Sequence, residues 1–385
     1  RQNISKHDIE AVSLILQSDY LTQGPAVPRF EQDVSRQCSA KYAVAVSSAT
    51  AALHIACRAL GVGPGDRVWT SAITFVASAN CALYCGATID FIDIDSKTYN
   101  LSVAHLEEKL LAAERMGTLP KVVIPVHMAG QSCEMTRIQD LSRRFGFRVI
   151  EDASHAVGAR YLDEFVGSCR YSDITIFSFH PVKIVTTGEG GVATTNCEEL
   201  AQKMALLRSH GITRDHNQMA NIPIGPWYYE QIDLGYNYRM TDIQAALGSS
   251  QLTKLDEFVS ARRLISDFYN ELFHDLPIET PWQHPETRSS FHLYIIRPDL
   301  AELNTSHTEL FERLKIRGVT ANHHYIPVYR HPYFSVMGFD QSEFPNAESY
   351  LMNAMSIPIF PGLTSDDQRF VVNALVTPRG HQTFF

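Results

Sequence analysis

A lysine with few charged neighbours is the first residue of this sequence with obvious chemical potential. Lys183 ends the apolar segment 177–183, and the glycine- and threonine-rich segment 186–191 follows almost directly. Most lysines are solvated surface charges, and in isolation Lys183 would be interpreted in the same way. Desolvation would lower the pKa of the amine and make it nucleophilic towards carbonyl carbons. The glycines would let the backbone pass close to a flat ligand.

An acidic pair ends a second apolar segment of the chain. Glu151 and Asp152 follow residues 148–150, and His155 comes shortly afterwards. A carboxylate at the end of a buried strand can pair with a cationic ring nitrogen and hold it protonated. It can equally cap a helix or bind a metal, so the motif alone leaves these alternatives open.

Three further positions could bind a phosphorylated aromatic ligand. Residues 47–53 are small or hydroxyl-bearing and join a predicted strand to a helix, whose N-terminus would bind an anion or simply be capped. Phe75 could stack on a flat ring, although most phenylalanines lie in the core. Asn237 precedes a predicted long helix and could donate to a phosphate or form a turn.

Short apolar segments alternate with helical patterns over the first 200 residues, which predicts parallel strands covered by helices on both faces. We expect strands at 42–46, 67–70, 89–92, 122–126, 148–150, 174–177 and 191–195, with helices that include 103–113 and 134–144. Ligands of such sheets bind at the carboxyl ends of the strands. Most of the motifs above lie at such an end.

The pattern changes from about Thr241 onwards. A long helical stretch, either continuous or with one break, runs towards Leu272, and strands at 292–296 and 319–325 flank a helix at 308–315. A final helix is expected from Thr364, which can form a capping box with Asp367. We therefore predict a large α/β domain over residues 1–250 and a smaller α+β domain over residues 251–385.

Composition and charge disfavour several classes of protein, among them nucleic-acid-binding and membrane proteins. The 385 residues carry 33 basic and 42 acidic side chains, a net charge of −9, without a long basic run, which disfavours nucleic acid or anionic membrane as a partner. No apolar stretch approaches the roughly 18 residues of a membrane span, and residues 1–6 lack a signal-like core. The seven cysteines lack ligand-like spacing, so we expect reduced thiols, no metal site and a cytoplasmic location.

Taken together and in their order along the chain, the five motifs resemble those of the DegT/DnrJ/EryC1/StrS family, the sugar aminotransferases that depend on pyridoxal 5′-phosphate (PLP). The resemblance extends from residues 21–25 to residues 357–361. It implies fold type I, with a mostly parallel central sheet sandwiched by helices and a smaller C-terminal domain.

The resemblance also implies a role for each motif. Lys183 matches the lysine that binds PLP as a Schiff base, and Asp152 matches the carboxylate paired with the ring nitrogen. The other matched cofactor residues are Phe75 on the ring face, His155 near the phenolic oxygen, Ala49, Thr50 and Ser178 at the phosphate, and Asn237 at the phosphate of a neighbouring subunit. The last match implies a homodimer with composite sites. Two positions depart from the family pattern, because Ala49 replaces the usual glycine and His155 the usual glutamine.

Closer similarity lies with the branch of the family that acts in pseudaminic acid biosynthesis, through segments 154–158, 177–180, 207–212, 226–231 and 324–329. This implies transfer of an amino group from L-glutamate to the C4 carbonyl of a UDP-4-keto-6-deoxy-N-acetylhexosamine of the L-altrosamine series. The positions expected to face that substrate are Tyr20, Leu21, Thr22, Ala49, Ser178, Asn237, His323, His324 and Tyr325. Arg29 and Arg239 are candidates for the diphosphate.

Other functions are compatible with parts of this pattern. The substrate could be a dTDP- or GDP-linked ketosugar, or a UDP-4-ketosugar of a bacillosamine-type pathway. A ketosugar dehydratase of the same fold would carry histidine where Lys183 stands. A regulatory protein that merely binds PLP would be favoured by loss of Lys183 or Asp152, and both residues are present.

Overall fold

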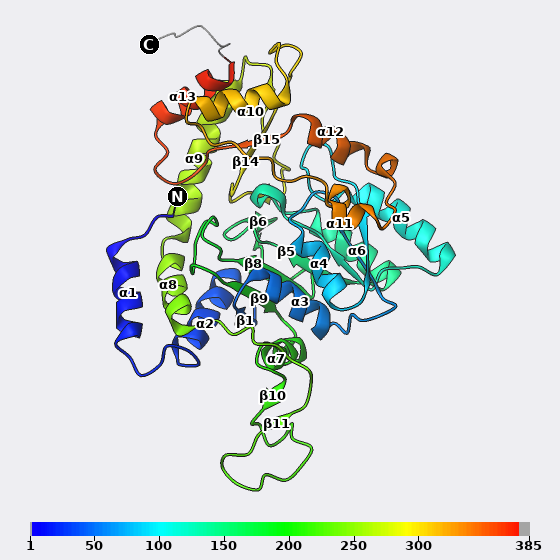
Figure 1. Cartoon of the computed structure of the whole chain (residues 1–385), viewed down its shortest axis with the longest axis vertical. Coiled ribbons are helices and arrows are strands. Elements are labelled where there is room, and N and C mark those ends of the chain that lie inside the picture. Colours follow the sequence, from blue (N-terminus) through cyan, green and yellow to red (C-terminus); the bar gives the residue numbers. More distant parts are fainter. Residues whose placement is uncertain (1, 377–385) are drawn as a thin grey trace.

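The computed structural model describes residues 2–376, and a seven-stranded sheet forms its centre (Figure 1). The strands lie in the order β1 (Tyr42–Val46), β9 (Gly191–Thr195), β8 (Ile174–Ser178), β5 (Arg148–Asp152), β4 (Val122–Ile124), β2 (Arg67–Ser71) and β3 (Thr88–Ile92). All pairs from β8 to β3 are parallel, whereas β9 runs antiparallel to both β8 and β1. The fold-type-I architecture expected from the sequence is thus confirmed, with β9 as the one reversed strand.

Helices cover both faces of this sheet, because the strands alternate apolar side chains towards two separate cores. One face packs against α3 (Ala49–Ala59), α4 (Ala77–Tyr84) and α7 (Glu198–Leu207). The other packs against α2 (Ala26–Cys38), α5 (Val103–Met116), α6 (Met135–Phe145) and α8 (Asp242–Leu252). Helix α1 (Lys6–Leu16) lies on α8, and its buried Asp8 bonds to Lys254 at 2.7 Å.

A second apolar core belongs to the C-terminal part of the chain. It is formed by α9 (Leu255–Phe273), α10 (His307–Ile316) and α13 (Ser365–Val376) around a small sheet of β12 (Ile278–Glu279), β14 (Tyr294–Pro298) and β15 (Met355–Ile357). The predicted capping box is confirmed, since the Thr364 hydroxyl accepts from the Asp367 N–H at 3.1 Å and the Thr364 N–H donates to the Asp367 carboxylate at 3.0 Å.

The strand predicted at residues 319–325 is wrong. Only Asn322 in this segment pairs with the small sheet, through an isolated bridge to Ser356. The next residues point their polar groups to unrelated partners: His323 to the Ala354 carbonyl, His324 to the Ser356 hydroxyl and Tyr325 to His155. These divergent side-chain bonds replace the regular ladder that a strand would require.

The remaining elements are short. They comprise α11 (Pro332–Ser335), α12 (Pro345–Asn353), three single helical turns (Met128–Gly130, Val328–Arg330, Gln341–Glu343), a three-stranded ribbon of β6 (Arg160–Tyr161), β7 (Glu164–Phe165) and β13 (Thr287–Arg288), and the pair β10 (Ile212–Thr213) and β11 (Glu230–Gln231). The β10–β11 arm projects away from the body of the protein (Figure 1). Over residues 2–376, no helix has the length and apolarity needed to cross a membrane.

Candidate active site

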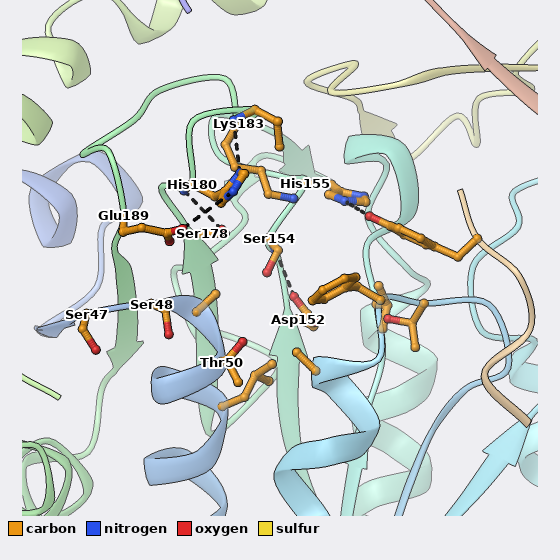
Figure 2. A pocket seen from close by; sticks show the side chains of 18 residues that line it. Ser47, Ser48, Thr50, Asp152, Ser154, His155, Ser178, His180, Lys183 and Glu189 are labelled. Atoms are coloured by element: carbon orange, nitrogen blue, oxygen red, sulfur yellow. Dashed lines mark hydrogen bonds and ion pairs between the residues drawn. The ribbon is translucent and has the colours of Figure 1, made fainter. Parts of the chain in front are cut away.

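A cavity of about 570 Å³ opens at the carboxyl ends of β1, β5 and β8, as expected for this kind of sheet. Eight predicted site residues line it: Ala49, Thr50, Phe75, Asp152, His155, Ser178, Lys183 and Tyr325. Figure 2 shows Lys183 and His155 on one side of Asp152 and the first turn of α3, with Ser48 and Thr50, on the other. Folding therefore brings together groups that are up to 276 positions apart (325 − 49).

Asp152 is the last residue of β5, and hydroxyl and amide donors fix its carboxylate. The Ser78 hydroxyl donates to Oδ2 at 2.6 Å, and the Ser154 N–H donates to Oδ1 at 3.1 Å. Thr74, which also lines the cavity, shares a 2.8 Å hydrogen bond with Ser78. Neither Thr74 nor Ser78 was predicted from the sequence. Their only sequence signal is the i, i+4 spacing of two hydroxyl residues after β2.

Lys183 lies in the loop that follows β8, where its own N–H donates to the His180 carbonyl at 2.9 Å. Burial lowers the pKa of the Lys183 amine to about 8, although the negative charge of Asp152 raises it. Near neutral pH, a larger fraction of this amine is therefore unprotonated than for a surface lysine. An amine in this state can attack a carbonyl carbon.

His155 and Tyr325 form a buried pair at the side of the cavity. His155 Nε2 and the Tyr325 hydroxyl share a hydrogen bond of 3.0 Å. Burial and the nearby charge of Lys183 hold the pKa of His155 well below its usual value, so its ring is neutral. Nδ1 of His155 is buried and has no hydrogen-bond partner among the described residues.

The first turn of α3 provides a potential anion site. The Ser48 hydroxyl caps the helix by accepting the Ala51 N–H at 3.1 Å, and the first-turn N–H groups have no partner within the helix. The backbone of β9 lies directly against this turn. A Cβ at Gly191 would come within 2.4 Å of the Ala49 nitrogen, so glycine is needed for this approach.

Phe75 is 56% exposed, so it is not a core residue. Its ring borders the cavity and lies 6.1 Å from that of Tyr325, measured between centroids. An exposed aromatic ring at the mouth of a cavity is available to stack on a flat ligand.

Several predicted residues do not line this cavity. Leu21 accepts the Asp242 N–H at 3.0 Å, and Thr22 forms a bridge with Thr241, which places the segment 20–22 beside the start of α8. Asn237 is exposed and bridges to Ser209. His323 and His324 turn towards the small sheet.

The two arginines considered for a diphosphate also lie outside the cavity. Arg29 is exposed on α2, and Arg239 donates to the Ser209 hydroxyl at 3.1 Å. All seven cysteines are free thiols.

A model of the DegT/DnrJ/EryC1/StrS aminotransferase family matches residues 2–376. The chain belongs to this family. It is 40% identical over 377 residues to the spore coat polysaccharide biosynthesis protein SpsC of Bacillus subtilis, which covers 97% of this chain and 94% of SpsC. It is 37% identical over 376 residues to UDP-4-amino-4,6-dideoxy-N-acetyl-beta-L-altrosamine transaminase of Campylobacter jejuni, covering 97% and 95% of the two chains.

A solved structure supports the same relationship. The PMP form of Spr1654 from Streptococcus pneumoniae superimposes with a TM-score of 0.87 and 30% identity, over 97% of each chain. As a member of the family, the protein is a PLP-dependent sugar aminotransferase.

The cavity contains groups that fit this cofactor. Lys183 would supply an amine for the aldehyde, and Asp152 would supply a fixed carboxylate for the ring nitrogen. The start of α3 would offer N–H groups to a phosphate, and the buried Nδ1 of His155 has no protein partner among the described residues.

Proposed function

We propose that this enzyme transfers an amino group from L-glutamate to the C4 carbonyl of a UDP-4-keto-6-deoxy-N-acetylhexosamine of the L-altrosamine series. The product would be a UDP-4-amino sugar for pseudaminic acid biosynthesis. The observation that carries transamination is the placement of Lys183, an amine with a lowered pKa, in one cavity with the fixed carboxylate of Asp152. The identity of 37% to the altrosamine transaminase, over nearly the whole chain, supports this substrate.

The chemistry divides between cofactor and chain. When bound, PLP supplies the electron sink that stabilises a carbanion at the donor's α-carbon. Lys183 would hold the cofactor covalently and, once released by the donor, would carry a proton as base and then as acid. Its lowered pKa suits both tasks near neutral pH. Asp152 would keep the ring nitrogen protonated, because an adjacent carboxylate favours the charged form of that nitrogen.

Other residues of the cavity would orient the cofactor. We assign the phosphate to Ala49, Thr50 and Ser178, and the face of the ring to Phe75. The His155–Tyr325 pair would lie at the phenolic oxygen, where a neutral histidine can accept or donate a hydrogen bond.

We further propose a homodimer with composite sites. Asn237 and the segment 20–22 are exposed outside the cavity of their own subunit, so they are available to a second copy. In that copy, Asn237 would reach the cofactor phosphate, and Tyr20, Leu21 and Thr22 would contact the nucleotide sugar.

The sugar and donor can be tested directly. We would incubate the enzyme and L-glutamate with UDP-, dTDP- and GDP-linked 4-keto-6-deoxysugars and identify the products by mass spectrometry and NMR. We expect amination at C4 of the UDP-linked L-altrosamine-series ketosugar. Preferred amination of a dTDP- or GDP-linked sugar would contradict the proposed substrate while leaving transamination intact.

Replacement of the lysine tests the reaction itself. We expect Lys183→Ala to abolish turnover, because no other side chain in the cavity can both bind the aldehyde and return the proton. The measurement is 2-oxoglutarate release per enzyme, with wild-type enzyme as the reference. Transamination by Lys183→Ala near the wild-type rate would exclude the proposed mechanism.

A further inference from the structure

A second cavity of about 300 Å³ lies between the two domains, next to Lys183. Val182 and Lys183 border both this interdomain cavity and the active-site cavity. Other lining residues come from both parts of the chain and include Ile184, Gln251, Arg262, His292, Asn322 and Ser356. A ligand in the interdomain cavity would therefore contact the same loop that carries the reactive amine.

Arg262 of α9 is the unusual residue of this cavity. It is only 5% exposed, and its Nη1 donates to the carbonyls of Phe291, His292 and Ile359 at 3.1, 3.2 and 2.9 Å. Nε is buried without a partner, and the hydrogen bonds of Arg262 to described residues all come from Nη1. Nε and Nη2 form the edge of a guanidinium that binds a carboxylate through two parallel hydrogen bonds. That edge has no hydrogen-bonded partner among the described residues.

The charges around Arg262 are also unbalanced. None of the described residues that line the interdomain cavity is acidic, although Lys183 and Arg262 are both basic. Burial and the charge of Lys183 lower the pKa of His324 to about 4 and hold the pKa of His292 well below its usual value. A buried cation without a counter-charge is unfavourable, and a bound anion would remove this penalty.

A second buried polar atom of this cavity also has no hydrogen-bond partner among the described residues. Nδ1 of His292 has no hydrogen bond among the described residues, and His292 lines the interdomain cavity with Arg262. The volume lies at the lower end of the range for ligand pockets, which suits a small anion better than a nucleotide sugar.

We propose that the interdomain cavity is a carboxylate subsite in which Arg262 binds a carboxylate of the amino donor. This inference rests on the proposed function and adds the residue that selects a dicarboxylic donor. The amine of the donor must replace the amine of Lys183, which borders both cavities. In this proposal, a donor with a second carboxylate would extend from the loop of Lys183 towards Arg262.

Glutarate is a suitable probe because it has both carboxylates of the donor and cannot react. We would titrate the holoenzyme with glutarate by calorimetry and compare it with butyrate, which has one carboxylate. We expect Arg262→Gln to weaken glutarate binding at least tenfold, since hydrogen bonds to charged groups are lost. The matched control is Arg263→Gln, because Arg263 also donates to carbonyls, those of Ser289 and Arg288, but does not line the cavity.

Steady-state kinetics separate the donor from the sugar. Arg262→Gln should raise KM for L-glutamate at least tenfold and change KM for the ketosugar less than twofold. A larger effect on the ketosugar would overturn the assignment and indicate that Arg262 binds the diphosphate. Unchanged glutarate affinity in a variant with wild-type thermal stability would also overturn it.

Arg262 supports three carbonyls, so its replacement could prevent folding. Thr320 is exposed and lines the same cavity, which makes it a safe position for a second variant. Thr320→Glu adds a carboxylate that competes for Arg262, whereas Thr320→Gln has the same shape without the charge. Weaker glutarate binding in Thr320→Glu alone supports the subsite, and equal binding in both variants contradicts it.

Glutarate binding needs no turnover, so the two proposals can fail separately. If the UDP-ketosugar is not aminated but glutarate still binds through Arg262, the sugar assignment is wrong and the subsite stands. If the UDP-ketosugar is aminated but glutarate affinity does not depend on Arg262, the subsite assignment is wrong and the proposed function stands.

Discussion

Two adjacent carboxylates on β5, Glu151 and Asp152, have nearly equal burial but different surroundings. Glu151 is 4% exposed and Asp152 is 5% exposed, and they point to opposite faces of the sheet. Glu151 accepts hydrogen bonds from His127 Nε2 at 2.7 Å, from Thr175 Oγ1 at 3.0 Å and from Ser172. Asp152 accepts one side-chain and one backbone bond and borders the active-site cavity.

This difference separates a structural carboxylate from a chemical one. Burial alone would raise the pKa of Glu151, but the hydrogen bonds from His127, Ser172 and Thr175 lower it below its usual value. The Cys133 N–H donates to Nδ1 of His127, which leaves the ring proton on Nε2 to bond Glu151. Protein donors thus satisfy Glu151, whereas Asp152 keeps an open side towards the cavity. Access to a cavity, rather than burial, is the feature that distinguishes Asp152, the carboxylate to which we assign a role in the reaction.

The largest expected difference between Asp152 and Glu151 is in how much their replacement lowers kcat. We expect Asp152→Asn to lower kcat by about a hundredfold or more, because an amide cannot hold the ring nitrogen protonated. Its thermal stability should stay close to that of the wild type, since the asparagine oxygen can still accept from Ser78. Stopped-flow absorbance and thermal unfolding provide the two measurements. An unchanged kcat would indicate that Asp152, like Glu151, has only a structural role.

Glu151→Gln should produce the opposite pattern. The new amide places a second donor among His127, Ser172 and Thr175, so we expect a loss of about 1–3 kcal/mol in the free energy of unfolding. The folded fraction should keep kcat within a few-fold of the wild type. Urea unfolding and active-site-normalised kinetics test both points.

A surface carboxylate provides the control for Glu151→Gln. Glu164 pairs with Arg170 at 2.7 Å near the surface, where an ion pair contributes little. Glu164→Gln should therefore change the free energy of unfolding by less than about 0.5 kcal/mol. If both variants lose the same stability, the network around Glu151 is not what stabilises the protein.

A smaller effect on the rate than that of Asp152→Asn is expected from the group that holds Asp152. Ser78→Ala removes the 2.6 Å bond to Oδ2, and we expect kcat to fall by up to about tenfold while PLP affinity stays near the wild-type value. Ser71→Ala is the matched control, because its buried hydroxyl has no hydrogen-bond partner among the described residues. Equal kcat values for the two variants would show that Ser78 does not position Asp152.

Much of the fold and the centre of the site could be predicted from the sequence. The strands of the large sheet are short apolar runs, and Lys183, Asp152 and Thr50 follow or join such runs, so their convergence at one edge of the sheet follows from the parallel order. The irregular segment 319–325 begins with the β-branched residues Val319 and Thr320, but only Asn322 pairs with a strand, through its bridge to Ser356. A sequence pattern does not reveal whether a neighbouring strand has room to pair.

The supporting residues were harder to predict. Ser78 lies 74 positions from Asp152, and apart from its i, i+4 spacing to Thr74 its local sequence does not distinguish it from other helical serines. In the sequence, Arg262 looks like an ordinary basic residue on an amphipathic helix. The folded structure is needed to show that its side chain is buried. Such roles depend on contacts between distant segments, which local patterns do not encode.

Gly191 shows that the shape of the site also limits which sequences can form it. Because the main chain of β9 fills the space beside the start of α3, even an alanine methyl group would push the two elements apart. The first turn of α3 would then lose its position although every polar side chain around it was retained. A homologue without glycine at position 191 would need a different arrangement of β9 and α3, even if it kept the residues equivalent to Lys183 and Asp152.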